Sequence, residues 1–156
     1  MIKTIFFFLS LSVFLGACSS QTAVEGKLDQ GDVRTALLAT GWPAKITTDT
    51  DFKISMKVLN TGAITIPSLG KDGDMLRVGA SYHWLGTDNR VVLWDGFFSP
   101  LKSDLKPGKS QDLLLAVRSP KAAGKYILEV DMLQNSVFWF GGAGSQTARM
   151  VIDVVD

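Results

Sequence analysis

Apolar and polar residues alternate through most of the chain after residue 33. Residues 52–58 place Phe52, Ile54 and Val58 on one side of an extended chain, with charged or small polar residues between them. Residues 76–84 repeat this period of two. Because successive side chains of a strand point to opposite faces, the pattern predicts half-buried strands. Similar runs occur at residues 90–94, 113–117, 126–132, 137–140 and 148–155.

Turn-forming residues separate these runs at short intervals. Asn60-Thr61-Gly62, Lys106-Pro107-Gly108 and Ser119-Pro120 are the clearest breaks. About eight short strands without a convincing helix predict an all-β fold, an immunoglobulin-like antiparallel β-sandwich over residues 33–156. Residues 33–39 fit two interpretations, a short helix capped by Asp32 or an alternating strand, and we expect an edge strand.

Two further expectations follow from the strand phases. His83, Glu129 and Asp131 fall opposite the apolar face of their strands, so we expect them on a solvated outer face. Tyr126 begins a late strand after a loop with proline and glycine. This arrangement is typical of a tyrosine corner, in which the hydroxyl bonds backbone a few residues upstream.

The N-terminus has the form of a secretory signal. Lys3 precedes about a dozen mostly apolar residues, a run too short to span a membrane, which takes about 20. The following Leu15-Gly16-Ala17-Cys18 resembles the lipobox of bacterial lipoproteins, in which the cysteine thiol takes a diacylglycerol. An ordinary signal with a cysteine nearby is the alternative. Cys18 is the single cysteine of the chain and stands where cleavage requires it, which favours lipidation.

This interpretation divides the chain into three parts. Residues 1–17 are a cleaved lipoprotein signal peptide, residues 18–32 carry the lipidated Cys18 and a flexible tether, and residues 33–156 form the sandwich. The expected place is the bacterial cell envelope, with membrane lipid as the first partner. Ser19, in place of the aspartate that often retains lipoproteins in the inner membrane, favours the periplasmic face of the outer membrane in a Gram-negative organism.

Charge and composition exclude several functions. The chain has 16 basic and 15 acidic residues, and Lys3 leaves with the signal, so the mature protein is close to neutral. A neutral chain without a basic cluster argues against a nucleic-acid partner.

Residues with catalytic or metal-binding potential are sparse. His83 is the single histidine, no G-x-S-x-G motif is present, and zinc sites usually need three or four histidine or cysteine ligands. We interpret residues 71–74 as a polar turn and residues 141–145 as a flexible hairpin connection. The sequence therefore predicts no enzyme, no cofactor and no metal site.

Aromatic residues of the second half are the remaining candidates for binding. Alternation places Trp139 opposite Phe138 and Phe140, and a sandwich core takes one side of each strand, so some rings must be exposed or covered by a loop. Exposed rings beside polar groups suit sugars and also suit protein partners. The candidate ligand-binding residues are Trp94, Trp139, Phe97, Phe98, His83 and Asp131.

A family resemblance covers roughly residues 33–155. It rests on Asn60-Thr61-Gly62, Tyr82-His83-Trp84-Leu85, Asp95-Gly96, Leu105-Lys106-Pro107-Gly108, Ser119-Pro120, Gly124-Lys125-Tyr126-Ile127-Leu128 and Val137-Phe138-Trp139-Phe140. This succession resembles an immunoglobulin-like accessory domain found beside bacterial glycosyltransferases and methyltransferases of surface-polysaccharide assembly. It is more distantly similar to the four-tryptophan domain of autophagy receptors. The chain departs from the pattern at Ile66-Pro67, where a tryptophan is usual.

The resemblance implies an accessory or binding role near envelope glycans and supplies no catalytic residues. Our leading hypothesis is therefore a membrane-anchored, non-catalytic lipoprotein that binds in the cell envelope and contacts surface polysaccharide. The alternative is a protein-binding lipoprotein, for example an assembly, secretion-system or immunity protein.

Overall fold

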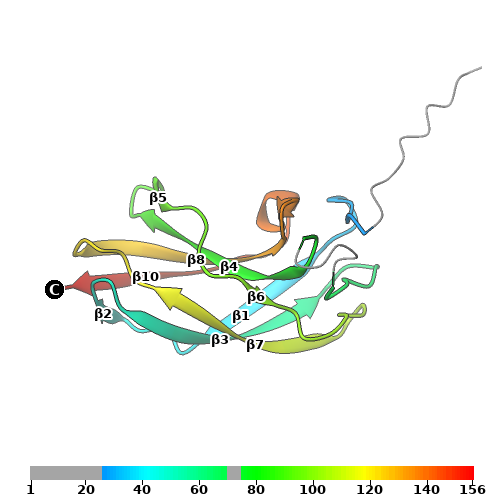
Figure 1. Cartoon of the computed structure of the whole chain (residues 1–156), viewed down its shortest axis with the longest axis horizontal. Coiled ribbons are helices and arrows are strands. Elements are labelled where there is room, and N and C mark those ends of the chain that lie inside the picture. The colour runs from blue at the N-terminus through cyan, green and yellow to red at the C-terminus, as the bar shows by residue number, and fades with distance from the viewer. Residues whose placement is uncertain (1–25, 70–74) are drawn as a thin grey trace, which may run out of the picture.

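Two β-sheets pack face to face in the computed structural model, which describes residues 26–69 and 75–156 (Figure 1). The fold predicted from the sequence is confirmed. The smaller sheet has the order β1-β3-β7 and consists of β1 (Thr35–Thr40), β3 (Asp51–Asn60) and β7 (Ser110–Arg118). The larger sheet has the order β2-β10-β8-β4-β5, with β6 on β4 and β9 on β8. Its strands are β2 (Lys45–Thr47), β4 (Val78–Gly86), β5 (Val91–Leu93), β6 (Ser99–Pro100), β8 (Gly124–Gln134), β9 (Phe138–Trp139) and β10 (Ala148–Val155).

Among the described strands, the pairing is antiparallel with one exception. β2 runs parallel to β10, with Lys45 opposite Asp153 and Thr47 opposite Val155. The sequence did not indicate β2 or β6, because a strand of two or three residues is too short to show a period. The predicted edge strand at residues 33–39 is confirmed as β1, which pairs with β3 alone in its sheet.

The core lies between the two sheets, where the apolar side of each strand faces its counterpart. Ile54, Trp84 and Leu128 are fully buried there. The predicted tyrosine corner is also confirmed, because the Tyr126 hydroxyl donates a hydrogen bond to the carbonyl oxygen of Ala122 at 3.0 Å. The apolar alternation of the sequence therefore describes the inner faces of the strands correctly.

The outer face of β4 and β8 differs from the prediction. His83 is 2% exposed and Asp131 is 4% exposed, so neither lies on a solvated surface. Both point away from the core, but the aromatic residues Trp94 and Trp139 lie over this part of the sheet. The strand phase was right and the expected exposure was wrong, because alternation assigns a face and says nothing about what covers it.

Residues 141–145 also differ from the prediction. They do not join two paired strands, because β9 and β10 both pair with β8 in the antiparallel sense. Gly141–Ala143 forms a short 3₁₀ helix, η1, that ends at Gly144 with a φ of 92°. The Gly141 N–H donates to the buried Asp131 carboxylate, which ties this segment to the sheet.

Part of the expected tether contacts the domain. The side-chain oxygen of Gln134 accepts a hydrogen bond from the Leu28 N–H at 2.8 Å, and its amide nitrogen donates to the carbonyl oxygen of Gly26 at 2.8 Å. Leu28 packs against the core. The predicted signal peptide, Cys18 and the turn at residues 71–74 lie outside the described residues. Across the described ranges, no helix is long and apolar enough to cross a membrane.

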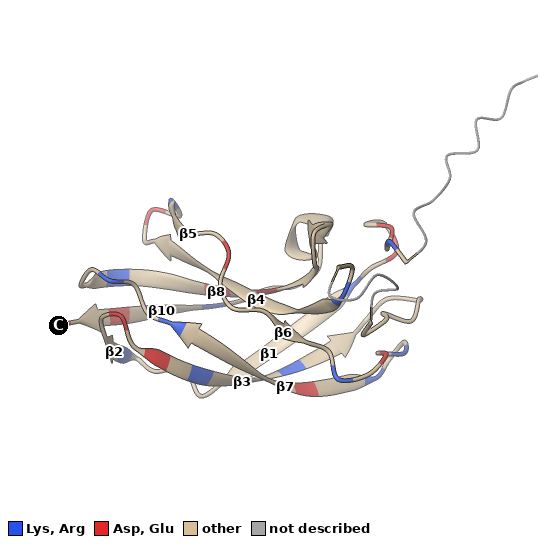
Figure 2. Ribbon diagram, in the orientation of Figure 1, with Lys and Arg blue, Asp and Glu red and all other residues tan. Residues whose placement is uncertain are grey.

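Charged residues of both signs are interspersed over the ribbon (Figure 2). On the smaller sheet they form local pairs, such as Lys57 with Asp112 at 2.7 Å. The outer surface of that sheet is thus a mixed, solvated face, unlike the covered outer face around His83.

Candidate functional site

Three aromatic rings meet on the outer face of the larger sheet. His83 comes from the middle of β4, Trp94 directly follows β5, and Trp139 belongs to β9. The ring centroids of His83 and Trp94 are 4.0 Å apart with an interplanar angle of 21°, and those of His83 and Trp139 are 4.1 Å apart. Trp94 and Trp139 meet edge to face at 6.1 Å. We call His83, Trp94 and Trp139 the aromatic cluster.

The segment after β5 is held over the sheet by backbone contacts. The Gly96 N–H donates to the carbonyl oxygen of Tyr82 at 3.0 Å, and His83 Nδ1 contacts the carbonyl oxygen of Trp94. A side chain at residue 96 would meet the Tyr82 ring, since a Cβ there would lie 2.3 Å from it. Glycine therefore permits the close approach that brings Trp94 onto His83.

A first pocket is lined by both tryptophans. It has a volume of about 430 Å³, and we call it the Ser81 pocket. Its lining includes Ser81, Trp94, Asp95, Phe98, Asn135 and Trp139. The Ser81 hydroxyl is buried and has no hydrogen-bond partner among the described residues. An unsatisfied buried hydroxyl is costly, so a ligand hydroxyl or water at this position would be stabilising.

A second pocket is lined by the same two tryptophans. It has a volume of about 270 Å³, and we call it the acidic pocket. Its lining includes His83, Trp94, Glu129, Asp131, Trp139 and Thr147. Glu129 lies opposite His83 and Asp131 lies opposite Ser81 in the β4–β8 ladder. The register of these two strands therefore brings both carboxylates beside the aromatic cluster.

Burial controls the protonation of Asp131. It raises the pKa of this carboxyl to about 6, although backbone N–H groups of Gly141 and Met132 oppose the shift by donating to it. The nearby charge of Glu129 raises the pKa further. Asp131 is thus largely ionised at pH 7 while being almost inaccessible to water.

His83 is neutral at physiological pH, because burial lowers its pKa below the usual value. The carbonyl oxygen of Trp94 can only accept a hydrogen bond, so the Nδ1 atom facing it carries the proton. In the neutral ring the Nε2 atom is then an acceptor. His83 thus supplies a second flat ring and one acceptor atom to the site.

The structure brings together four of the six predicted site residues. Trp94, Trp139, His83 and Asp131 surround the acidic pocket, and Phe98 lines the Ser81 pocket. Phe97 lines neither pocket and packs edge-on against Tyr82, with ring centroids 6.5 Å apart.

The sequence reasoning did not include Ser81, Asp95, Asn135 or Glu129 among the site residues. Ser81 is two positions from His83, so strand periodicity already placed both on one face. Asp95 and Asn135 lie in loops, for which the sequence offered no comparable signal. In the part of the chain that the structure describes, no group of three or more His, Cys, Asp or Glu residues could hold a metal ion.

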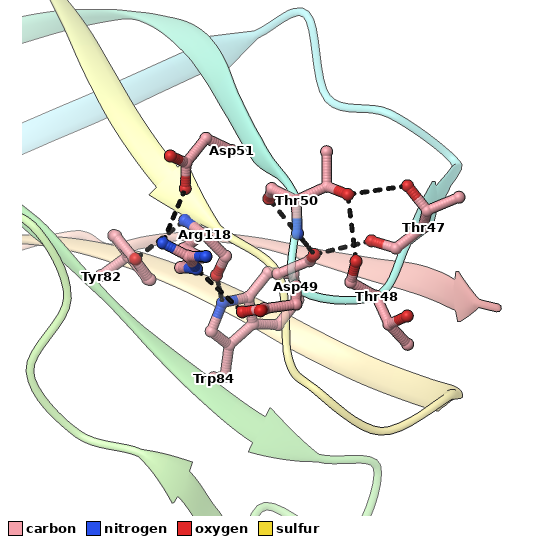
Figure 3. Close-up of polar contacts among 9 residues, drawn as sticks. Thr47, Thr48, Asp49, Thr50, Asp51, Tyr82, Trp84 and Arg118 are labelled. Carbon is pink, nitrogen blue, oxygen red and sulfur yellow. Dashed lines mark hydrogen bonds and ion pairs between the residues drawn. The ribbon is translucent and has the colours of Figure 1, made fainter.

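A third hollow, which we call the end cleft, opens at one end of the sandwich and has a volume of about 750 Å³. Its lining includes Trp84, Val92, Leu93, Arg118, Lys121 and Tyr126. Figure 3 shows that the Arg118 guanidinium points to Asp49 and Asp51, with N···O distances of 2.8 and 3.9 Å. The Arg118 backbone is also engaged, since its N–H donates to the Tyr82 hydroxyl and its carbonyl oxygen accepts from the Trp84 indole. Arg118 therefore joins the two sheets here.

Comparison with known proteins gives likeness of structure alone. No protein-family profile and no curated protein matches the sequence. The chain is similar to the solution structure of a CARDB domain from Pyrococcus furiosus, with 16% identity, a TM-score of 0.46 and coverage of 80% of this chain and 94% of that one. A crystal structure of the same domain with two metal ions shows 18% identity and a TM-score of 0.46 over 80% and 88% of the two chains.

A β-glucosidase from Listeria innocua in complex with glucose is similar at 10% identity, with a TM-score of 0.48. The match covers 80% of this chain and 16% of the enzyme. Identities this low concern the fold alone.

Proposed function

We propose that this protein is a lipid-anchored, non-catalytic binding module of the cell envelope that contacts surface polysaccharide through the aromatic cluster and its two pockets. The observation that carries the proposal is that Trp94 and Trp139 line both the Ser81 pocket and the acidic pocket. Trp94 is 48% exposed although it stacks on His83, so part of its ring is open to a ligand.

The chemistry of the site suits sugars. A pyranose presents apolar C–H groups on its faces and hydroxyls around its rim, so a binding site needs flat rings and nearby hydrogen-bonding groups. Tryptophan rings provide the flat surfaces. Hydrogen-bonding groups are also present, because Ser81, Asp95 and Asn135 line the Ser81 pocket.

Two features of the sequence support the place of action. The lipobox-like segment ending at Cys18 indicates attachment to a membrane, and two or three acyl chains suffice for stable anchoring. The resemblance to accessory domains of surface-polysaccharide assembly points to glycans as neighbours.

Replacement of Cys18 by alanine is expected to release the protein from the membrane fraction and to abolish labelling by radioactive palmitate. Retention and labelling of that variant would refute lipid anchoring.

The glycan proposal is tested by NMR titration of the four tryptophan indole N–H signals with polysaccharide fragments purified from the producing organism. Trp94 and Trp139 are expected to shift. Trp42 is expected to stay in place because its indole N–H is bonded to the Ala39 carbonyl away from the site. If no native fragment moves the Trp94 and Trp139 signals, the glycan proposal fails.

A matched pair of variants assigns the binding to the site. Trp94→Ala removes a ring of the aromatic cluster and is expected to lower affinity at least about tenfold. Val92→Ala shortens an exposed apolar side chain two residues away that lines the end cleft instead, and is expected to leave affinity unchanged. Equal effects of the two substitutions would exclude a specific role for Trp94.

The second candidate function is protein binding at the end cleft. It is favoured by β5, in which Val91, Val92 and Leu93 are all exposed. Figure 1 shows this strand at the margin of the larger sheet. The same titration separates the two functions, because Trp84 lines the end cleft. A protein partner bound there is expected to move the Trp84 signal and leave Trp139 unchanged.

A further inference from the structure

We propose that the acidic pocket binds an ammonium group, so that the preferred glycan carries a free amine next to the sugar held in the Ser81 pocket. This inference rests on the proposed function and specifies the chemical class of its ligand. It is carried by three observations: the aromatic rings, the buried Asp131 carboxylate beside the partly buried Glu129, and the two tryptophans that line both pockets.

The rings supply the first part of the argument. A cation is attracted to the negative face of an aromatic ring, most strongly to tryptophan, and the attraction grows when the site is desolvated. Two tryptophans and the neutral His83 ring line a hollow of about 270 Å³. The close stacking of His83 on Trp94 fixes the orientation of these rings before any ligand arrives.

The carboxylates supply the second part. Asp131 accepts hydrogen bonds from two backbone N–H groups and forms no ion pair among the described residues. Among the described residues, its Oδ2 atom accepts one hydrogen bond, from the Gly141 N–H, and a carboxylate oxygen can accept a second. A buried carboxylate without a cation is costly, and an ammonium group would offset that cost.

The remaining charges around the pocket leave it acidic. Glu129 accepts a hydrogen bond from the Thr147 hydroxyl at 2.9 Å, and the Arg149 guanidinium lies 3.6 Å from the same oxygen. Arg149 also donates to the Asn89 side chain at 2.8 Å, and its own side chain is partly exposed. Asp95 lies close enough to His83 to affect its titration. The lining of the acidic pocket thus contains two carboxylates, and the described guanidinium of Arg149 lies beside Glu129 alone, which favours a cationic ligand over an anionic one.

The shared tryptophan wall links the two pockets. Trp94 and Trp139 line both, and Asp131 lies opposite Ser81 on neighbouring strands. A ligand that packs on these rings can place a hydroxyl beside the Ser81 hydroxyl, which has no hydrogen-bond partner among the described residues. The same ligand can place an ammonium group beside Glu129 and Asp131. An amino sugar combines both groups in one residue or in two adjacent residues.

The requirement for charge is tested with two small probes of the same shape. Choline and 3,3-dimethylbutan-1-ol differ in a quaternary nitrogen that replaces a carbon, so any difference in affinity reports the charge. At pH 7, choline is expected to bind at least about tenfold more tightly and to move the Trp94 and Trp139 indole signals. Equal or stronger binding of the neutral alcohol would overturn the inference.

Carboxylate variants locate the charge. Glu129→Gln and Asp131→Asn keep the size of each side chain and are each expected to lower the affinity for choline about fivefold or more. Asp112→Asn is the matched control, because that carboxylate lies on β7 in the other sheet. Unchanged Trp42 and Trp84 signals verify that a variant is folded. If both site variants bind choline as the wild type does, the acidic pocket is not the ammonium site.

Two oligosaccharides then test the source of the ammonium group. The tetramers of glucosamine and of N-acetylglucosamine share one backbone and differ in the free amine. Tighter binding of the glucosamine tetramer, lost in Asp131→Asn, supports the inference. Equal binding of both tetramers overturns it and leaves the glycan function intact. If the protein binds choline but no glycan, the ammonium site is supported and the proposed glycan-binding function is refuted.

Discussion

Strands β3 and β4 have the same alternating pattern of apolar and polar residues, but the polar residues are exposed in β3 and buried in β4. In β3, Lys53, Ser55 and Lys57 are exposed while the residues between them are buried. In β4, the apolar Ala80, Tyr82 and Trp84 face the core, and the polar Ser81 and His83 between them are buried as well. The outer face of β3 meets water, whereas the outer face of β4 lies beneath Trp94 and Trp139.

The difference lies in the segments that follow each strand. After β4, the chain returns through β5, and Gly96 holds the next residues against Tyr82. After β8, β9 places Trp139 over His83. Within residues 26–69 and 75–156, nothing comparable covers the middle of β3, whose sheet has β1 and β7 at its edges. A polar residue on a strand thus becomes a candidate binding group where a connecting segment shields it.

The largest expected effect concerns the inner face of β4. Trp84→Ala removes a fully buried side chain and its hydrogen bond to the Arg118 carbonyl, and is expected to lower the free energy of unfolding by about 3–5 kcal/mol. Trp94→Ala, on the half-exposed side, is expected to cost about 1 kcal/mol. Urea unfolding followed by far-ultraviolet circular dichroism measures both. Similar losses would mean that the outer ring belongs to the core.

The next effect is a pH dependence caused by Asp131. Because its pKa is raised to about 6 from 3.8, the folded protein holds the proton more tightly than the unfolded chain between these values. The Asp131 contribution to stability therefore falls as pH rises from about 4 to about 6, by at most about 3 kcal/mol.

Asp131→Asn removes this contribution. Urea unfolding of both proteins from pH 4 to pH 7 is expected to show the wild type losing stability relative to the variant as pH rises. A constant difference between the two proteins across this range would contradict a raised pKa and would place Asp131 in a solvated environment like that of the β3 outer face.

A third prediction concerns the segment after β5, which covers the outer face of β4. Gly96→Ala places a methyl group against the Tyr82 ring and is expected to cost about 2 kcal/mol and to increase the solvent accessibility of His83. Hydrogen exchange and the titration of His83 by NMR measure the change. Gly142→Ala is the control, because a Cβ there meets no atom within 4 Å. An unaltered His83 in Gly96→Ala would show that the segment after β5 does not shield it.

The smallest effect compares one polar residue from each outer face. His83→Ala removes the stacked ring and leaves the Trp94 carbonyl without its partner, and is expected to cost about 1.5 kcal/mol. Lys53→Ala, at an exposed position of β3, is expected to change stability by less than about 0.5 kcal/mol. Thermal unfolding of the two variants tests whether the outer faces differ as the structure indicates.

The alternation of apolar and polar residues predicted much of the fold and the aromatic residues of the candidate site, but not all of its polar residues. The strand phases of residues 52–58 and 76–84, the edge strand β1 and the Tyr126 hydrogen bond were all available from the sequence. The aromatic candidates Trp94 and Trp139 were also visible, because alternation cannot bury both faces of a strand in one core. Ser81 and Glu129 were missed as site residues, since their importance depends on which strands pair and in which register.

The sequence by itself determined which side of each strand faces the core, because a strand has a fixed period of two and apolar side chains avoid water. Tertiary structure alone decided which polar residues would be removed from water on the other side. That outcome requires segments distant in sequence to meet, as Trp94 and Trp139 do over His83. These long-range contacts depend on strand pairing and on close backbone approaches such as that of Gly96 to Tyr82. Neither can be read from the pattern of neighbouring residues.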